Sequence, residues 1–166
     1  MGKAILITGF NNWGKSRLIF ELFNQQRFVF GRTFHLTSVN QDFVVETHSN
    51  DDYNQADFIE RVTRRMQGTM RNENLICGFC PTREQNNSAL EILQSPVFQR
   101  FDEIYLFLLR YKWDHHAELM IQNLRTHFQN AGVTLVEINA DAQLQNDAQS
   151  LSARVQQVTN EVNNVF

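Results

Sequence analysis

The run from Gly9 to Ser16, GFNNWGKS, constrains the fold more than any other part of the sequence. It matches G-x-x-x-x-G-K-[ST], a pattern in which glycines let the backbone curve closely and point its N–H groups at phosphate oxygens. Residues 4–8 before it read as a short buried strand. Apolar residues at 18, 19, 22 and 23 read as one face of a following helix. This order predicts a phosphate-binding loop that also uses the positive end of the helix dipole.

The polar residues of this loop have separate expected roles. Lys15 would reach the outer phosphates of a nucleotide, and the Ser16 hydroxyl would hold a magnesium ion. The residues expected to bind the nucleotide are Gly9, Asn11, Asn12, Trp13, Gly14, Lys15, Ser16 and Arg17. Trp13 is unusual in such a loop. We favour a packing role for it, and the alternatives are stacking on a base or covering the phosphates.

Size and charge limit the classes of protein that the chain can belong to. Its 166 residues are expected to form one nucleotide-binding domain, residues 1–166. The net charge of -3 argues against a dedicated nucleic-acid binder. No apolar run is long enough to span a membrane, and the apolar start lacks the charged region of a signal peptide. With only two cysteines, the composition predicts a cytoplasmic protein.

Strand-like and helix-like segments alternate along the chain. Strands are expected at 4–8, 28–30, 33–38, 43–47, 75–79, 104–109 and 133–138. Helices are expected after the loop and at 56–66, 88–93 (with a possible start at 84 and an end near Pro96), 117–128 and 144–162. The alternation predicts an α/β three-layer sandwich with a mostly parallel central sheet flanked by helices. The region 28–47 has a hairpin as its alternative. Fourteen phenylalanines predict an aromatic-rich core.

In a parallel sheet, ligands bind at the carboxyl ends of the strands. The phosphate loop and the segments 46–52, 77–85, 110–116 and 139–141 follow such ends, so we expect them to surround one cleft.

The loop alone does not select a reaction, so other motifs must do so. The Asn-Lys-x-Asp and Asp-x-x-Gly motifs of GTPases are absent, and the strand 75–79 ends without the acid that large ring and motor ATPases need. A small-molecule kinase remains, in which arginines clamp the phosphates.

The segment 75–85, LICGFCPTREQ, resembles the Asp-Gly-Phe-Pro-Arg-Thr-x-x-Gln signature of adenylate kinases and related nucleoside monophosphate kinases. The positions that match are Gly78, Phe79, Thr82 and Gln85. The resemblance implies a P-loop kinase-like fold, with the final loop near 139–141 close to the base of ATP. Cys77 stands at the family's magnesium-associated Asp, Cys80 at its Pro and Pro81 at its phosphate-reading Arg. These departures leave catalytic activity open.

An active enzyme would need another carboxylate and at least one arginine. Glu46 and Asp51 are the candidates to order metal-bound water or to take a proton from an acceptor. The alternative for residues 50–52 is a solvated turn that caps the next helix. Arg110, just past the strand 104–109, is the candidate to clamp the transferred phosphoryl group.

Cys77 and Cys80 have C-x-x-C spacing, and His115 and His116 could add zinc ligands. We discount zinc because no second pair of cysteines exists and adjacent histidines diverge on a helix. A redox pair is discounted as well, because thioredoxin-like motifs open a helix rather than end a strand.

Two functional hypotheses result. The first is a kinase of nucleotide or nucleoside type that moves the γ-phosphoryl group of ATP, with Mg²⁺, to an unidentified small molecule. The second is a catalytically degenerate nucleotide-binding or regulatory module that acts through a protein partner.

Overall fold

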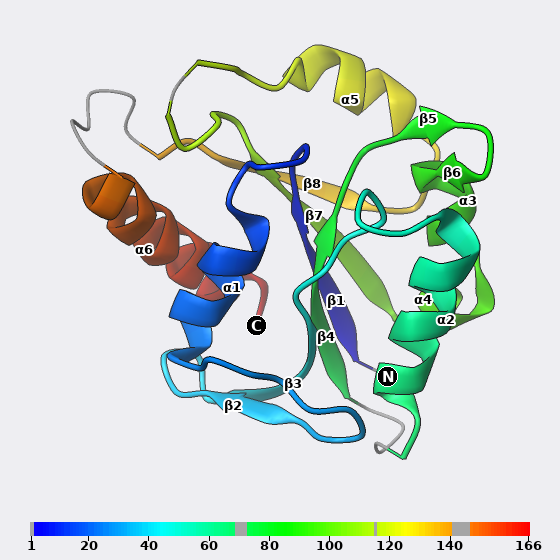
Figure 1. The fold of residues 1–166 in the computed structure, drawn as a ribbon, viewed down its shortest axis with the longest axis horizontal. Coiled ribbons are helices and arrows are strands. Elements are labelled where there is room, and N and C mark those ends of the chain that lie inside the picture. The colour runs from blue at the N-terminus through cyan, green and yellow to red at the C-terminus, as the bar shows by residue number, and fades with distance from the viewer. Residues whose placement is uncertain (1, 69–72, 115, 141–146) are drawn as a thin grey trace.

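A six-stranded sheet with the order β2-β3-β4-β1-β7-β8 forms the centre of the protein (Figure 1). The fold is described from a computed structural model that covers residues 2–68, 73–114, 116–140 and 147–166. The strands are β1 (Lys3–Thr8), β2 (Phe34–Leu36), β3 (Gln41–Glu46), β4 (Asn74–Phe79), β7 (Glu103–Leu109) and β8 (Thr134–Ile138). All run parallel except β2, which pairs antiparallel with β3. The predicted α/β class with a mostly parallel sheet is confirmed.

Helices cover both faces of this sheet. They are α1 (Lys15–Phe23), α2 (Gln55–Met66), α3 (Ala89–Leu93), α4 (Pro96–Gln99), α5 (Ile121–His127) and α6 (Asp147–Val165). In Figure 1, α1 and α6 lie together on one side, and α2, α3 and α4 lie on the other. A small hairpin of β5 (Arg83–Glu84) and β6 (Asn87–Ser88) leads into α3.

The core explains why the central strands are apolar throughout. β1 lies between β4 and β7, and residues 4–7 are fully buried because helices cover both of its faces. Ile5 is opposite Ile76 on one side and Tyr105 on the other. The fully buried aromatic side chains are Phe43, Phe58, Phe79, Phe98 and Phe107, so the predicted aromatic-rich core is confirmed.

Several boundaries differ from the sequence-based expectation. Residues 28–30 form no strand, and 33–38 shortens to β2, which makes a hairpin with β3 inside the main sheet. The helix expected at 88–93 is α3, which ends at Leu93 near Pro96 as expected. Pro96 then begins the short helix α4, because a proline at the first helical position needs no hydrogen-bond acceptor for its nitrogen. Residues 117–120 are not helical, since the Lys112 amide donates to the Ala117 carbonyl at 2.9 Å and the Leu119 amide donates to the Arg110 carbonyl at 2.7 Å.

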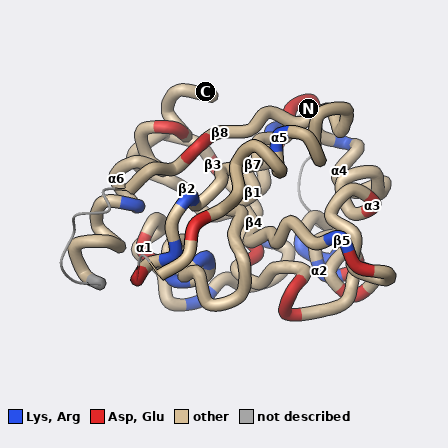
Figure 2. The backbone as a smooth tube through the Cα atoms, turned by 90° about the horizontal axis from the view of Figure 1, so that it is seen from above, with Lys and Arg blue, Asp and Glu red and all other residues tan. Residues whose placement is uncertain are grey.

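The parallel strands β1, β3, β4, β7 and β8 all end at the same edge of the sheet. The segments 9–14, 47–54, 80–82, 110–120 and 139–140 follow them. Charged residues of both signs are interspersed along the backbone rather than gathered on one element (Figure 2). Within the described residues, no helix has the length and apolar character needed to cross a membrane.

Candidate functional site

The phosphate-loop sequence forms a tight connection between β1 and α1. Asn12 and Gly14 have positive φ angles of 62° and 79°, which a glycine or an asparagine adopts more easily than other residues. A Cβ atom on Gly9 would lie 3.3 Å from the Cβ of Trp13, so the backbone approaches this side chain closely. The strand, loop and helix order predicted from the sequence is therefore present.

Lys15 lies inside the curve of this loop. Its ammonium donates to the carbonyl oxygens of Gly9 and Phe10, both at 2.8 Å, and lies 3.4 Å from a carboxylate oxygen of Asp51. The Lys15 side chain is only 7% exposed, so Asp51 supplies the counter-charge that a buried cation requires. Asp51 thus meets the loop, as predicted.

Two further side chains donate hydrogen bonds to carbonyl oxygens of the loop. The Trp113 indole donates to the Asn12 carbonyl at 2.7 Å, and the buried Arg154 of α6 donates to the Trp13 carbonyl at 2.7 Å. Arg154 also donates to the carbonyl of Tyr111. Burial lowers the pKa of Arg154 to about 10, and Asp114 partly opposes this effect. The loop carbonyls are thereby directed toward side-chain donors.

The helix α1 begins directly after this loop. The first-turn amides of Lys15, Ser16 and Arg17 have no acceptor within the helix, as at any helix N-terminus. Gly14 is the N-cap and supplies no side-chain cap. A bound anion would supply the acceptors that these amides need.

Ser16 and Asp51 are joined through the segment that follows β3. The Ser16 hydroxyl donates to the Thr47 carbonyl at 2.8 Å, and the Ser49 hydroxyl donates to Asp51. The predicted alternative, a solvated turn that caps the next helix, is wrong in two respects. Asn50 is fully buried and bonds both the amide and the carbonyl of Cys80, and α2 is capped by Asn54 instead.

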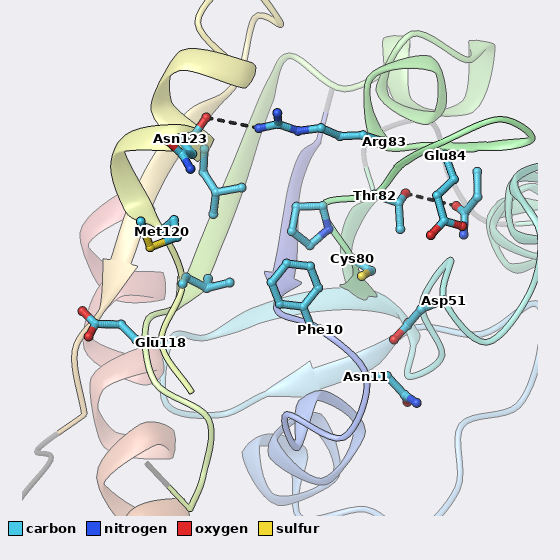
Figure 3. A pocket seen from close by; sticks show the side chains of 14 residues that line it. Phe10, Asn11, Asp51, Cys80, Thr82, Arg83, Glu84, Glu118, Met120 and Asn123 are labelled. Carbon is cyan, nitrogen blue, oxygen red and sulfur yellow. Dashed lines mark hydrogen bonds between the residues drawn. The ribbon is translucent and has the colours of Figure 1, made fainter. Parts of the chain in front are cut away.

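A cavity of about 810 Å³ opens beside the loop. It is lined by Phe10, Asn11, Asp51, Cys80, Pro81, Thr82, Arg83, Glu84, Asn87, Glu118, Leu119, Met120, Asn123 and Leu124. Figure 3 shows Phe10 in the middle of this hollow, with Asp51 and Asn11 on one side and Met120 and Glu118 on the other. The predicted cleft therefore includes the phosphate loop and parts of 46–52 and 77–85. The wall formed by residues 118–124 was not predicted.

Glu46 does not lie at this cavity. It is fully buried and pairs with Arg61 and, at 3.1 Å, with Arg65, both on α2. His48 lies 3.8 Å from the same carboxylate. Because both oxygens of Glu46 are taken by guanidinium groups, this residue does not fit the metal-binding role expected for it.

Arg110 and Arg17 are also placed away from the cavity lining. Arg110 donates to Glu118 at 2.8 Å, and this bond raises the pKa of the guanidinium. Arg17 is exposed on α1 and lines a smaller hollow of about 110 Å³ with Gly14, Trp113, Leu151 and Arg154. Of the predicted segment 139–141, Asp141 lies outside the described residues.

Both cysteines are free and buried. Burial raises the pKa of Cys77 well above its usual value and raises that of Cys80 to about 12, with the negative charge of Asp51 adding to the second shift. In the part of the chain that the structure describes, no cluster of three or more His, Cys, Asp or Glu residues could hold a metal ion. His115 lies outside that part.

Trp13 packs in the core, as favoured from the sequence, and is only 4% exposed. Its ring meets Phe10 edge-on with centroids 5.7 Å apart, and Phe10 is 44% exposed toward the cavity. Phe10 is therefore the aromatic residue of the loop that a ligand could contact.

Sequence reasoning missed Trp113 and Arg154 as supports of the loop. For Arg154 a signal existed, because it lies three residues after Leu151 and four before Val158, within the apolar face predicted for the last helix. A charged residue in such a stripe indicates a buried partner. Trp113 lies in a connecting segment without periodicity, and no comparable signal marks it.

Nothing similar was found in the comparisons. The chain matches no protein-family model, no curated protein and no solved structure.

Proposed function

We propose that this protein binds a nucleoside triphosphate, with ATP as the expected one, and transfers its γ-phosphoryl group to a small molecule in a P-loop kinase-like fold. The observation that carries the proposal is the position of Lys15. It lies within a curved loop whose carbonyls are bound by side chains, and it contacts an acid that lines an 810 Å³ cavity. A donor loop beside an acceptor-sized cavity is what phosphoryl transfer requires.

In this proposal the loop binds the phosphates through backbone amides and the start of α1. Lys15 exchanges its bonds to the Gly9 and Phe10 carbonyls for bonds to phosphate oxygens, which neutralises charge on the group in transit. Arg154 and Trp113 act as positioning residues because they bond loop carbonyls and fix the curve. Catalysis would consist of positioning and electrostatic stabilisation.

The residues present fit a magnesium ion of the kind that accompanies ATP. Mg²⁺ uses one or two protein oxygens, keeps several waters and binds substrate phosphates. The Ser16 hydroxyl donates its proton to Thr47, which leaves its oxygen lone pairs for a cation. Asp51 fits as the acceptor for a metal-bound water, and Glu46 does not fit. When bound, the ion would neutralise part of the negative charge of the phosphates.

A nucleotide-binding module with little turnover is the second candidate. The specific observation in its favour is that Arg110 is held by Glu118 rather than aimed at the loop. Arg83 is the one cation among the described residues that line the cavity, and it donates to the Asn123 carbonyl at 3.4 Å.

A titration of thermal stability tests the binding step. The purified protein is heated with ATP, GTP or ADP, with and without magnesium. A ligand at 100 times its dissociation constant adds about 2.7 kcal/mol to the free energy of unfolding. We expect a magnesium-dependent rise of the midpoint with ATP. No rise with any nucleotide would refute nucleotide binding, whereas a rise without transfer to any acceptor would favour the second candidate.

A further inference from the structure

The charges around the cavity indicate which acceptors it can receive. Among its described lining residues, the carboxylates of Asp51, Glu84 and Glu118 are accompanied by one guanidinium, Arg83. Glu118 is paired with Arg110. Once the triphosphate engages Lys15, the excess of negative charge therefore comes from Asp51 and Glu84 against Arg83. A phosphate group brought by an acceptor would meet these carboxylates in a partly enclosed space, where repulsion is stronger than in bulk water.

The nearby cations do not reverse this balance. Lys15 is bound by the loop and by Asp51, and the proposed function assigns it to the triphosphate. Arg110 is paired with Glu118 at 2.8 Å and does not line the cavity. In the described structure, Arg83 is the one cation that lines the hollow, and it donates to the Asn123 carbonyl at 3.4 Å.

The remaining lining is suited to an uncharged molecule with hydroxyl groups and an apolar part. Phe10 and Met120 are 44% and 68% exposed, and they offer an aromatic ring and a flexible thioether for a flat or apolar group. The polar groups around them are amides and a hydroxyl, from Asn11, Thr82, Asn87 and Asn123. Such groups hydrogen-bond to hydroxyls without requiring a charge.

We propose that the acceptor is a hydroxyl compound that carries no phosphate group, of nucleoside or sugar-like chemistry, and that Asp51 accepts the proton of the reacting hydroxyl. This inference rests on the proposed function and specifies its substrate class. Asp51 is the carboxylate that both lines the cavity and contacts the loop lysine, so it stands between donor and acceptor.

The step balances without a further reactant. The acceptor oxygen forms a bond to the γ-phosphorus, and the bond from that phosphorus to the bridging oxygen of ATP breaks. The electron pair of the broken bond stays on ADP. The proton of the hydroxyl passes to Asp51 and then to water. The products are ADP and a phosphate monoester, whose new negative charge the acidic lining would help to expel.

The test uses matched probes with and without a phosphate. The protein is incubated with Mg²⁺ and ATP labelled at the γ position, together with four ribonucleosides, thymidine, glucosamine or glycerol. Parallel reactions contain the 5′-monophosphates of the same nucleosides. We expect labelled product from at least one phosphate-free probe, and transfer to its monophosphate at least about tenfold slower. Faster transfer to a monophosphate would overturn the proposal. So would no transfer to any probe by a protein that binds ATP.

Substitutions separate the role of Asp51 from a structural one. Asp51→Asn should lower kcat by about 10²–10⁴-fold, while the KM for ATP changes little. The matched control is Asp52→Asn, because Asp52 accepts the Ser49 amide at 3.0 Å and an amide oxygen can still do so. That variant should keep its turnover. An unchanged kcat in Asp51→Asn would refute the assignment to Asp51.

A third variant tests the charge argument directly. The substitution Glu84→Gln removes one negative charge from the cavity lining while keeping side-chain size, and it leaves the pair between Arg110 and Glu118 in place. We expect the affinity for the nucleoside monophosphate probes to rise by about tenfold. Unchanged discrimination against these probes would show that the lining charge does not select the acceptor. The thermal titration with ATP distinguishes either failure from a failure of nucleotide binding itself.

Discussion

At the scale of single residues, Lys15 is expected to contribute to the stability of the fold as well as to ligand binding. The side chain is buried and contacts two carbonyls and Asp51. We expect Lys15→Ala to reduce ATP affinity at least about tenfold and to lower the free energy of unfolding by about 1–3 kcal/mol, because Asp51 loses its counter-charge. Adding Asp51→Asn should restore part of the stability and none of the affinity. Calorimetry and urea unfolding measure the two effects. Wild-type ATP binding by Lys15→Ala would show that the loop is not the site.

Cys80 gives a residue-scale prediction about alkaline pH. Its pKa is about 12 in the folded protein, against an ordinary value of 9.0, so the unfolded chain loses its thiol proton first. The free energy of unfolding should therefore fall as pH rises above 9, by up to about 1.4 kcal/mol per pH unit from this thiol. Urea unfolding at pH 8, 9.5 and 10.5 under reducing conditions measures the slope. Cys80→Ala should have a shallower slope, and an identical slope in both proteins would contradict the assignment.

At the scale of elements, the end of β3 and the helix α2 are joined by the pairs that Glu46 makes with Arg61 and Arg65. Removing one partner of a buried ion pair typically costs about 3–5 kcal/mol. We expect Glu46→Gln to destabilise the fold on this scale and to leave the ATP affinity of the folded fraction unchanged. Arg61→Gln should cost less, because Arg61 is 25% exposed and Arg65 remains in place. Loss of magnesium-dependent binding in folded Glu46→Gln would restore the metal role for this residue.

The elements also show what sequence patterns can predict. β1, β4 and β7 were predictable because burial on both faces makes a strand apolar throughout, and α2 was predictable from its apolar spacing. Short elements were not. β5 and β6 have two residues each, and residues 117–120 have a helix-like composition but pair with 110–112 through tertiary hydrogen bonds. These segments are too short to show the repeat of apolar residues by which a strand or helix is identified in a sequence.

At the scale of the whole molecule, Arg154 connects the last helix to the loop near the start of the chain. Arg154→Ala would leave the carbonyls of Trp13 and Tyr111 without this donor, which should cost about 1–3 kcal/mol of stability. We expect ATP affinity to fall as well, although Arg154 contacts no phosphate in our proposal. The matched control is Arg125→Ala. This substitution removes an exposed ion pair with Glu137 at 3.2 Å, and it should change the free energy of unfolding by less than about 1 kcal/mol. Equal effects of both substitutions would contradict the anchoring role.

The candidate site could be predicted from the sequence only in part, because some of its contacts join segments that are far apart in the chain. The phosphate loop is contiguous in sequence, so Gly9, Lys15 and Ser16 could be identified from their spacing. The placement of Asp51 against Lys15, of Glu46 against α2 and of Arg110 against Glu118 depends on how separate segments pack. Each of these acids and arginines has the same local pattern whether it faces a ligand or a partner side chain.

The bond between Arg154 and Trp13 spans 141 positions of the sequence, which has a consequence for how the protein is made. The ribosome synthesises the loop at residues 9–16 early and Arg154, which donates to the loop, late. During most of synthesis the nascent chain would contain this loop without the hydrogen bond from Arg154. If the loop binds a nucleotide as proposed, it would bind well only after α6 has docked, and a chain stalled before Arg154 would expose a loop without this support.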